Sequence, residues 1–104
     1  MQPKNIRDAL PDHLATEACE DILRAPGVRI ERIVSKGHAS PEWYDQDEGE
    51  WVMVVAGRAT VEFADGSVCH LSAGDYLDIP AHCRHRVAWT DPDDLTIWLA
   101  VWYR

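Results

Sequence analysis

The chain has few cysteines, few basic residues and no long hydrophobic run. Its three cysteines, Cys19, Cys69 and Cys83, are odd in number and form no C-x-x-C pair. This pattern argues against a disulfide framework and a structural zinc site, and it favours a reduced, cytoplasmic protein. No stretch approaches the roughly 18 consecutive apolar residues of a membrane-spanning helix, and residues 1–14 lack the apolar core of a signal peptide. We therefore expect neither a membrane span nor a secretion signal.

The charge balance is acidic. Ten Lys and Arg residues stand against eighteen Asp and Glu residues, which gives a formal net charge of −8. Nucleic acids and anionic membranes are negatively charged, so an acidic surface repels both, and we expect neither as a partner. The 104 residues, 46% of them hydrophobic, are enough for one globular domain with its own core.

The first quarter of the chain predicts a short helix over residues 12–25. Apolar residues recur there at helical spacing: Leu14, Ala18, Ile22 and Leu23. Asp12 is suited to the N-cap position, and Pro26-Gly27 ends the helix. We expect residues 1–27 to form an N-terminal segment that carries this helix.

From Val28 onward the pattern changes to short runs of β-branched and aromatic residues separated by turn residues. Asp65-Gly66, between two such runs, is the strongest hairpin signal in the chain. Seven or eight short strands without intervening helices are typical of an antiparallel sandwich or a small barrel. We therefore assign residues 28–104 to an all-β barrel.

The last predicted strand, Leu95–Tyr103, is apolar on both faces, so both faces should be covered. One face carries Trp98 and Trp102 with Ala100 between them. Either the N-terminal helix or a partner subunit could cover the face that the core does not use. Because the apolar stripe of the helix is narrow, we expect a homodimer that pairs through the Trp98 face.

Two segments together form a recognisable motif pair. In the first, Gly37, Glu50 and Gly57 match the fixed positions of G-x5-H-x-H-x3-4-E-x6-G. In the second, G-x5-P-x-G-x2-H-x3-N, the matching residues are Gly74, Pro80 and His85. This spacing resembles the cupin superfamily, and the resemblance covers Val28 to Tyr103. It implies a double-stranded β-helix, the jelly-roll barrel of the cupins, and pairing of such small barrels through their sheets.

The resemblance also implies a divalent metal ion, iron, manganese, nickel or zinc, which three histidines and one glutamate hold in the family. This chain departs from that ligand set, because Trp43 and Asp45 stand where the first motif has its histidines. Only Glu50 and His85 carry over. Asp45 and His82 could complete a set of two carboxylates and two imidazoles, which suits Fe²⁺, Mn²⁺ or Zn²⁺.

Two other arrangements remain open. A shift of one residue in the turn would align Tyr44 and Gln46, in place of Trp43 and Asp45, with the two motif histidines. Alternatively, Glu50 and His85 simply form a hydrogen bond to each other inside a metal-free barrel. The sequence does not decide between them.

The aromatic residues bear on the ligand. Five tryptophans and three tyrosines are a large number for a chain of this length, and aromatic rings with a few polar groups suit a pocket for a small organic molecule. The first hypothesis is a metal-containing cupin that binds or transforms a small molecule, as a dioxygenase or an isomerase. The second is a non-catalytic binding or sensor module whose metal ligands have been lost.

Overall fold

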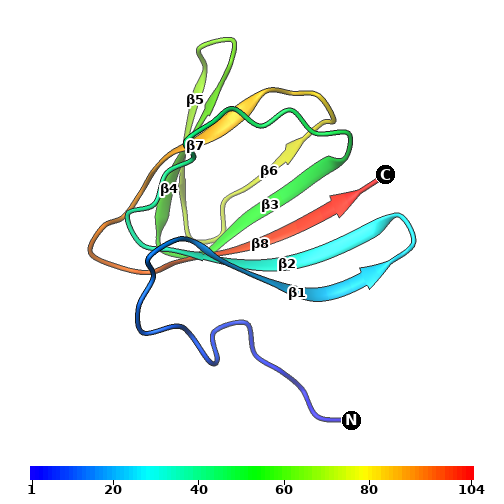
Figure 1. Ribbon diagram of the computed structural model, residues 1–104, viewed down its shortest axis with the longest axis vertical. Coiled ribbons are helices and arrows are strands. Elements are labelled where there is room, and N and C mark those ends of the chain that lie inside the picture. Colours follow the sequence, from blue (N-terminus) through cyan, green and yellow to red (C-terminus); the bar gives the residue numbers. More distant parts are fainter.

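The computed structural model describes all 104 residues and contains eight β-strands (Figure 1). The strands are β1 (Ala18–Ala25), β2 (Val28–Ser35), β3 (Gly49–Ala56), β4 (Arg58–Phe63), β5 (Val68–Ser72), β6 (Tyr76–Ile79), β7 (His85–Thr90) and β8 (Thr96–Tyr103). The structure holds no helix that could cross a membrane. The predicted all-β barrel is confirmed.

The strands form two antiparallel sheets. The larger has the order β1-β2-β8-β3-β6 and the smaller the order β5-β4-β7. β8 lies at the centre of the larger sheet, where it pairs with β2 on one side and β3 on the other. The inward-facing residues of both sheets form one core: Val52, Val54, Ala59, Val61, Leu71, Ile79, Trp98 and Ala100.

The predicted helix over residues 12–25 is wrong. Its second half is strand β1, which pairs with β2 from Ala18 opposite Val34 to Ala25 opposite Val28. Pro26 and Gly27 form a tight turn between the two strands, with Gly27 at φ +75°, as a turn with Pro followed by Gly requires. Pairing with β2 satisfies the backbone of residues 18–25 and overrides their local helical periodicity.

The expected exposed face of β8 is also corrected. Trp98 is 3% exposed and belongs to the core, and Trp102 packs against the same cluster. The outward-facing residues are the alternate ones, Leu99 and Val101. Both faces of the strand are apolar, as expected. The tryptophans face the interior, where the side chains of the core surround their rings.

Part of the outer face is covered by the N-terminal segment, which runs below β1 and β2 in Figure 1. Arg32 on β2 is 6% exposed, and its guanidinium donates to the backbone carbonyls of Ile6, Asp8 and Ala9. It also lies 3.2 Å from a carboxylate oxygen of Glu20. A single buried cation therefore holds the start of the chain against the sheet.

The motif glycines have a backbone reason. Gly37, Gly57 and Gly74 all have positive φ, which other residues adopt only under strain. At Gly57, between β3 and β4, a Cβ would also lie 2.6 Å from the Cα of Thr96. These positions shape the barrel rather than the chemistry of its interior.

The contacts of Arg32 generate a prediction about the N-terminal segment. In Arg32→Met, the carbonyls of residues 6–9 lose their donor, and we expect trypsin to cleave after Lys4 and Arg7 faster than in the unmodified chain. We expect the free energy of unfolding to fall by about 1.5–3 kcal/mol, since hydrogen bonds to charged groups contribute about this much. Mass spectrometry of the digest and urea unfolding measure the two effects.

The matched control is Arg24→Met, which removes an exposed guanidinium that contacts only Asp21. It should leave both the cleavage rate and the stability unchanged. Equal cleavage in the two variants would show that Arg32 does not hold the segment.

Candidate functional site

A cavity of about 180 Å³ lies between the two sheets, and nine of its fourteen lining residues are hydrophobic. Its apolar walls include Ile33, Val52, Val61, Ile79, Val87, Trp98 and Trp102. An apolar cavity of about 150 Å³ can hold a benzene ring, so this one has room for a single ring or a molecule of similar size. It is the natural place for a small ligand in this fold.

A carboxylate and an imidazole form the buried polar pair of this cavity. Glu50 on β3 is 7% exposed and His85 on β7 is 3% exposed, and Glu50 Oε1 lies 3.2 Å from His85 Nε2. β3 and β7 belong to different sheets, so the contact joins the two halves of the barrel. One residue from each of the two sequence motifs thus meets the other at this point.

The surroundings of His85 fix its orientation. Its Nδ1 lies 2.8 Å from the carbonyl oxygen of Cys83, so Nδ1 carries a hydrogen and donates it. Burial alone lowers the pKa of His85, but the hydrogen bonds to Glu50 and the Cys83 carbonyl outweigh it, and the pKa lies above its ordinary value. The pair can therefore hold a proton at Nε2, between the imidazole and the carboxylate, where a bound molecule could exchange it.

The other two predicted metal ligands lie elsewhere. His82 Nδ1 lies 2.8 Å from Asp45 Oδ1, and both side chains are more than half exposed. The second ring nitrogen of His82 faces Asp47 at 3.4 Å. Neither Asp45 nor His82 lines the cavity, so the four predicted ligands separate into an inner pair and an outer pair.

Of the two alignments of the first motif, the structure favours the shifted one. Tyr44 and Gln46 line the cavity beside Glu50 and His85. The backbones of Tyr44 and His85 also form a two-way antiparallel bridge, and their rings lie 5.7 Å apart. A phenol and an amide therefore lie in the cavity wall beside the Glu50–His85 pair.

Only some of the tryptophans lie at the cavity. Trp98 and Trp102 line the cavity, whereas Trp43 and Trp89 do not. The guanidinium of Arg86 lies 4.4 Å from the Trp43 ring centre, and Trp89 is 42% exposed.

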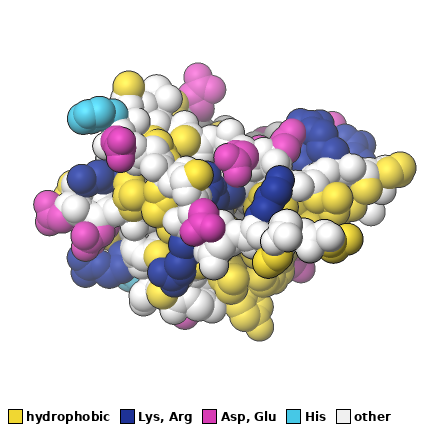
Figure 2. Space-filling view, turned by 90° about the horizontal axis from the view of Figure 1, so that it is seen from below, with side chains coloured by type: hydrophobic (Ala, Val, Ile, Leu, Met, Phe, Trp, Pro, Cys, Tyr) yellow, Lys and Arg dark blue, Asp and Glu magenta, His cyan; other side chains and the backbone are white.

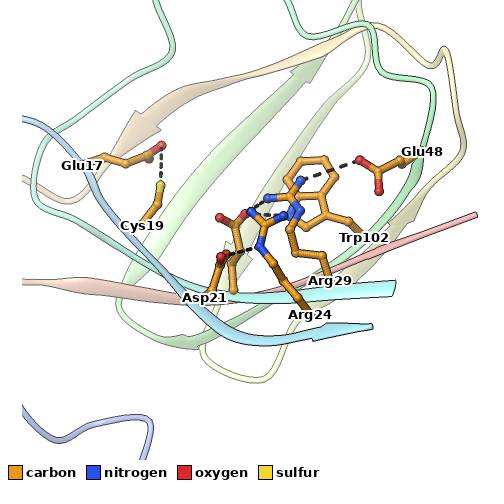
Figure 3. Close-up of polar contacts among 8 residues, drawn as sticks. Glu17, Cys19, Asp21, Arg24, Arg29, Glu48 and Trp102 are labelled. Atoms are coloured by element: carbon orange, nitrogen blue, oxygen red, sulfur yellow. Dashed lines mark hydrogen bonds and ion pairs between the residues drawn. The ribbon is translucent and has the colours of Figure 1, made fainter. Parts of the chain in front are cut away.

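Three polar residues of the cavity wall were not predicted: Glu17, Cys19 and Glu31. Figure 3 shows Glu17 and Cys19 side by side on the β1 side of the site, with Arg29 against the ring of Trp102. Glu17 and Cys19 were not predicted because the sequence analysis expects residues 12–25 to be helical, whereas Glu31 lies in a predicted strand and no motif singles it out. Recognising the Pro26-Gly27 turn as a hairpin would have placed Cys19 opposite Ile33, on the inner face.

Glu31 is held by two donors. Its Oε1 accepts a hydrogen bond of 2.7 Å from the indole nitrogen of Trp102 and lies 3.0 Å from Arg29 Nη1. Arg29 in turn lies 3.7 Å from Glu48 and 4.9 Å from the Trp102 ring centre. Burial, together with Glu17 and Glu31, raises the pKa of Cys19 to about 11, so its thiol stays protonated.

Comparisons with known proteins agree with this architecture. Residues 30–102 match the cupin domain model. A solved protein of Ralstonia eutropha JMP134, described as a candidate mannose-6-phosphate isomerase, is 44% identical over 99% of this chain and 98% of its own, with a TM-score of 0.93. A search of curated proteins found no significant match.

Two more distant structures share the fold. A Neisseria meningitidis protein is 18% identical, with a TM-score of 0.74 over 99% of this chain and 100% of its own. A cupin superfamily protein of Desulfitobacterium hafniense is 17% identical, with a TM-score of 0.76 over 90% of this chain and 83% of its own. The barrel, the motif spacing and the domain match together lead to one conclusion: the chain belongs to the cupin family.

Proposed function

We propose that the protein binds a small organic molecule in the cavity between its sheets, with the Glu50–His85 pair as the polar anchor. The observation that carries the proposal is a mostly apolar cavity with one buried carboxylate–imidazole contact in its wall. Apolar walls supply binding energy, and a few fixed polar groups orient the ligand. The three free cysteines are consistent with a reducing, cytoplasmic setting.

A sugar phosphate, the ligand that the description of the Ralstonia protein suggests, suits this cavity poorly. None of the fourteen lining residues is Lys or Arg, and three are glutamates. Phosphate sites in proteins rely on Arg, Lys or clustered backbone N–H groups, because the ligand is an anion. We therefore propose a ligand without a phosphate group.

A divalent metal held by Glu50 and His85 is the second candidate. The hydrogen bond from His85 Nδ1 to a backbone carbonyl favours it, since metal-binding histidines are oriented in this way. However, no three His, Cys, Asp or Glu side chains converge on one point, whereas catalytic metal sites have about three protein ligands. Tyr44 and Gln46 add only weaker oxygen donors. The donor set fits a resident metal incompletely, and we derive no chemistry through one.

We also propose that the protein pairs through the outer face of the larger sheet. Three large hydrophobic side chains are at least one-third exposed on this face: Leu23, Tyr76 and Tyr103. Figure 2, seen from below, shows hydrophobic patches on the side where the N-terminal segment lies. Apolar patches of this kind are typical of surfaces that bind another protein.

The ligand proposal predicts that filling the cavity abolishes binding. We expect ligand-observed NMR to detect at least one binder among single-ring compounds, and we expect Ile33→Trp, which places an indole in the cavity wall, to bind none. Val68→Trp, at a 49% exposed position of β5, is the matched control and should bind like the unmodified chain. Equal binding by Ile33→Trp would place the ligand elsewhere, and the absence of any binder would contradict the proposal.

The amount of bound metal separates the ligand proposal from the metal alternative. With only two strong donors, we expect elemental analysis of untagged protein to find far less than one divalent metal ion per chain. We also expect EDTA to leave the thermal midpoint unchanged. One equivalent of metal that disappears in both Glu50→Ala and His85→Ala would establish the second candidate instead.

The pairing proposal predicts a mass of about twice 11.8 kDa by light scattering at micromolar concentration. Val101→Lys, which puts a charge in the middle of the outer face, should give a monomer. Trp89→Lys, on the smaller sheet, is the control and should remain a dimer. A monomeric unmodified chain would contradict the pairing.

A further inference from the structure

The charges of the cavity wall are predominantly negative. Glu17, Glu31 and Glu50 line the cavity, and the only lining residue that can carry a positive charge is His85. The carboxylates differ in their partners. Glu50 faces His85 at 3.2 Å, and Glu31 faces Arg29 at 3.0 Å, so each of these two has a counter-ion.

Glu17 has no such counter-ion. Its Oε2 accepts a hydrogen bond of 3.2 Å from the hydroxyl of Ser35, and its Oε1 lies 4.0 Å from the thiol of Cys19. Both donors are neutral, and no Lys, Arg or His lies within ion-pair distance of this half-buried carboxylate. An uncompensated charge beside an apolar cavity is costly, and a ligand of opposite charge would offset that cost.

Glu50 also presents an acceptor to the same cavity. The Glu50 side chain is nine-tenths buried, and its only hydrogen bond is the one that Oε1 accepts from His85 Nε2. Its Oε2 is therefore left without a donor. A ligand rich in N–H groups would satisfy it, whereas an anionic ligand would be repelled.

The aromatic wall favours the same class of ligand. Indole rings attract cations through their π faces, and Trp102 already holds the guanidinium of Arg29 at 4.9 Å from its ring centre. Trp98 and Tyr44 offer further rings to the cavity. Glu17 and Glu31 both add to the rise in the pKa of the Cys19 thiol, which agrees with a negative electrostatic potential at this wall.

We infer that the ligand of this cavity is a small organic cation, an ammonium group on a compact apolar body. The ammonium lies against Glu17, and the body packs against Ile33 and Trp98. The size of the cavity limits that body to about one ring. This inference rests on the proposed small-molecule function and specifies the chemical class of its ligand.

The test uses three compounds with the same ring and different charge: benzylamine, benzyl alcohol and benzoate. We expect calorimetry or NMR titration at neutral pH to rank benzylamine about tenfold tighter than benzyl alcohol, with benzoate weakest. In Glu17→Gln, benzylamine should lose about tenfold in affinity while benzyl alcohol is unaffected. Benzyl alcohol thus shows that the variant is folded and its cavity intact.

Glu62→Gln is the matched control, because Glu62 pairs with Arg86 on the smaller sheet and does not line the cavity. It should bind all three compounds like the unmodified chain. Tighter binding of benzoate or benzyl alcohol than of benzylamine, or an unchanged benzylamine affinity in Glu17→Gln, would overturn the inference and leave the proposed function standing. If none of the three compounds binds, the inference is overturned, and the screen of single-ring compounds described above decides whether the proposed function stands.

Discussion

The contact between Glu50 and His85 is the constraint around which the interior is arranged. It is a buried polar contact between the two sheets, and it has an apolar core on one side and a cavity on the other. Removing either partner would leave the other buried without a counterpart, which costs far more than the pair gains when intact. The segment before β3 supports the pair as well, because Tyr44 bridges to the backbone of His85 and closes the wall beside it. The chemistry of the cavity and the closure of the barrel therefore depend on the same residues.

Much of the fold could be predicted because its signals are local. Turn residues separate the strands from Val28 onward, and the motif glycines have the positive φ that such turns require. The N-terminal segment could not be predicted in this way. Its helical spacing is a local signal too, but pairing with β2 is a contact between segments that the periodicity of either one does not contain. Because residues 12–25 were predicted to be helical, the contribution of Glu17 and Cys19 to the cavity wall was not predicted.

The candidate site was predictable in its centre and not at its edge. Glu50 and His85 were found because their spacing belongs to two motifs that meet in the fold. The loop between β2 and β3 could be aligned in two ways that differ by one residue, and such a shift exchanges inward for outward side chains. The three-dimensional structure is needed to show that Tyr44 and Gln46 face the cavity, whereas Asp45 pairs with His82 outside it.

The irregularity in β1 has a consequence for solubility. β1 is an edge strand, and an exposed edge is a template on which another chain can extend the sheet. Here the register shifts between Asp21 and Leu23, which leaves Ile22 as an extra residue and interrupts the regular row of backbone donors and acceptors. The charged side chains of Asp21 and Arg24 stand near the same point. The β1 edge is thereby a poor template for the addition of another strand, even though the outer face of the sheet is rich in apolar side chains.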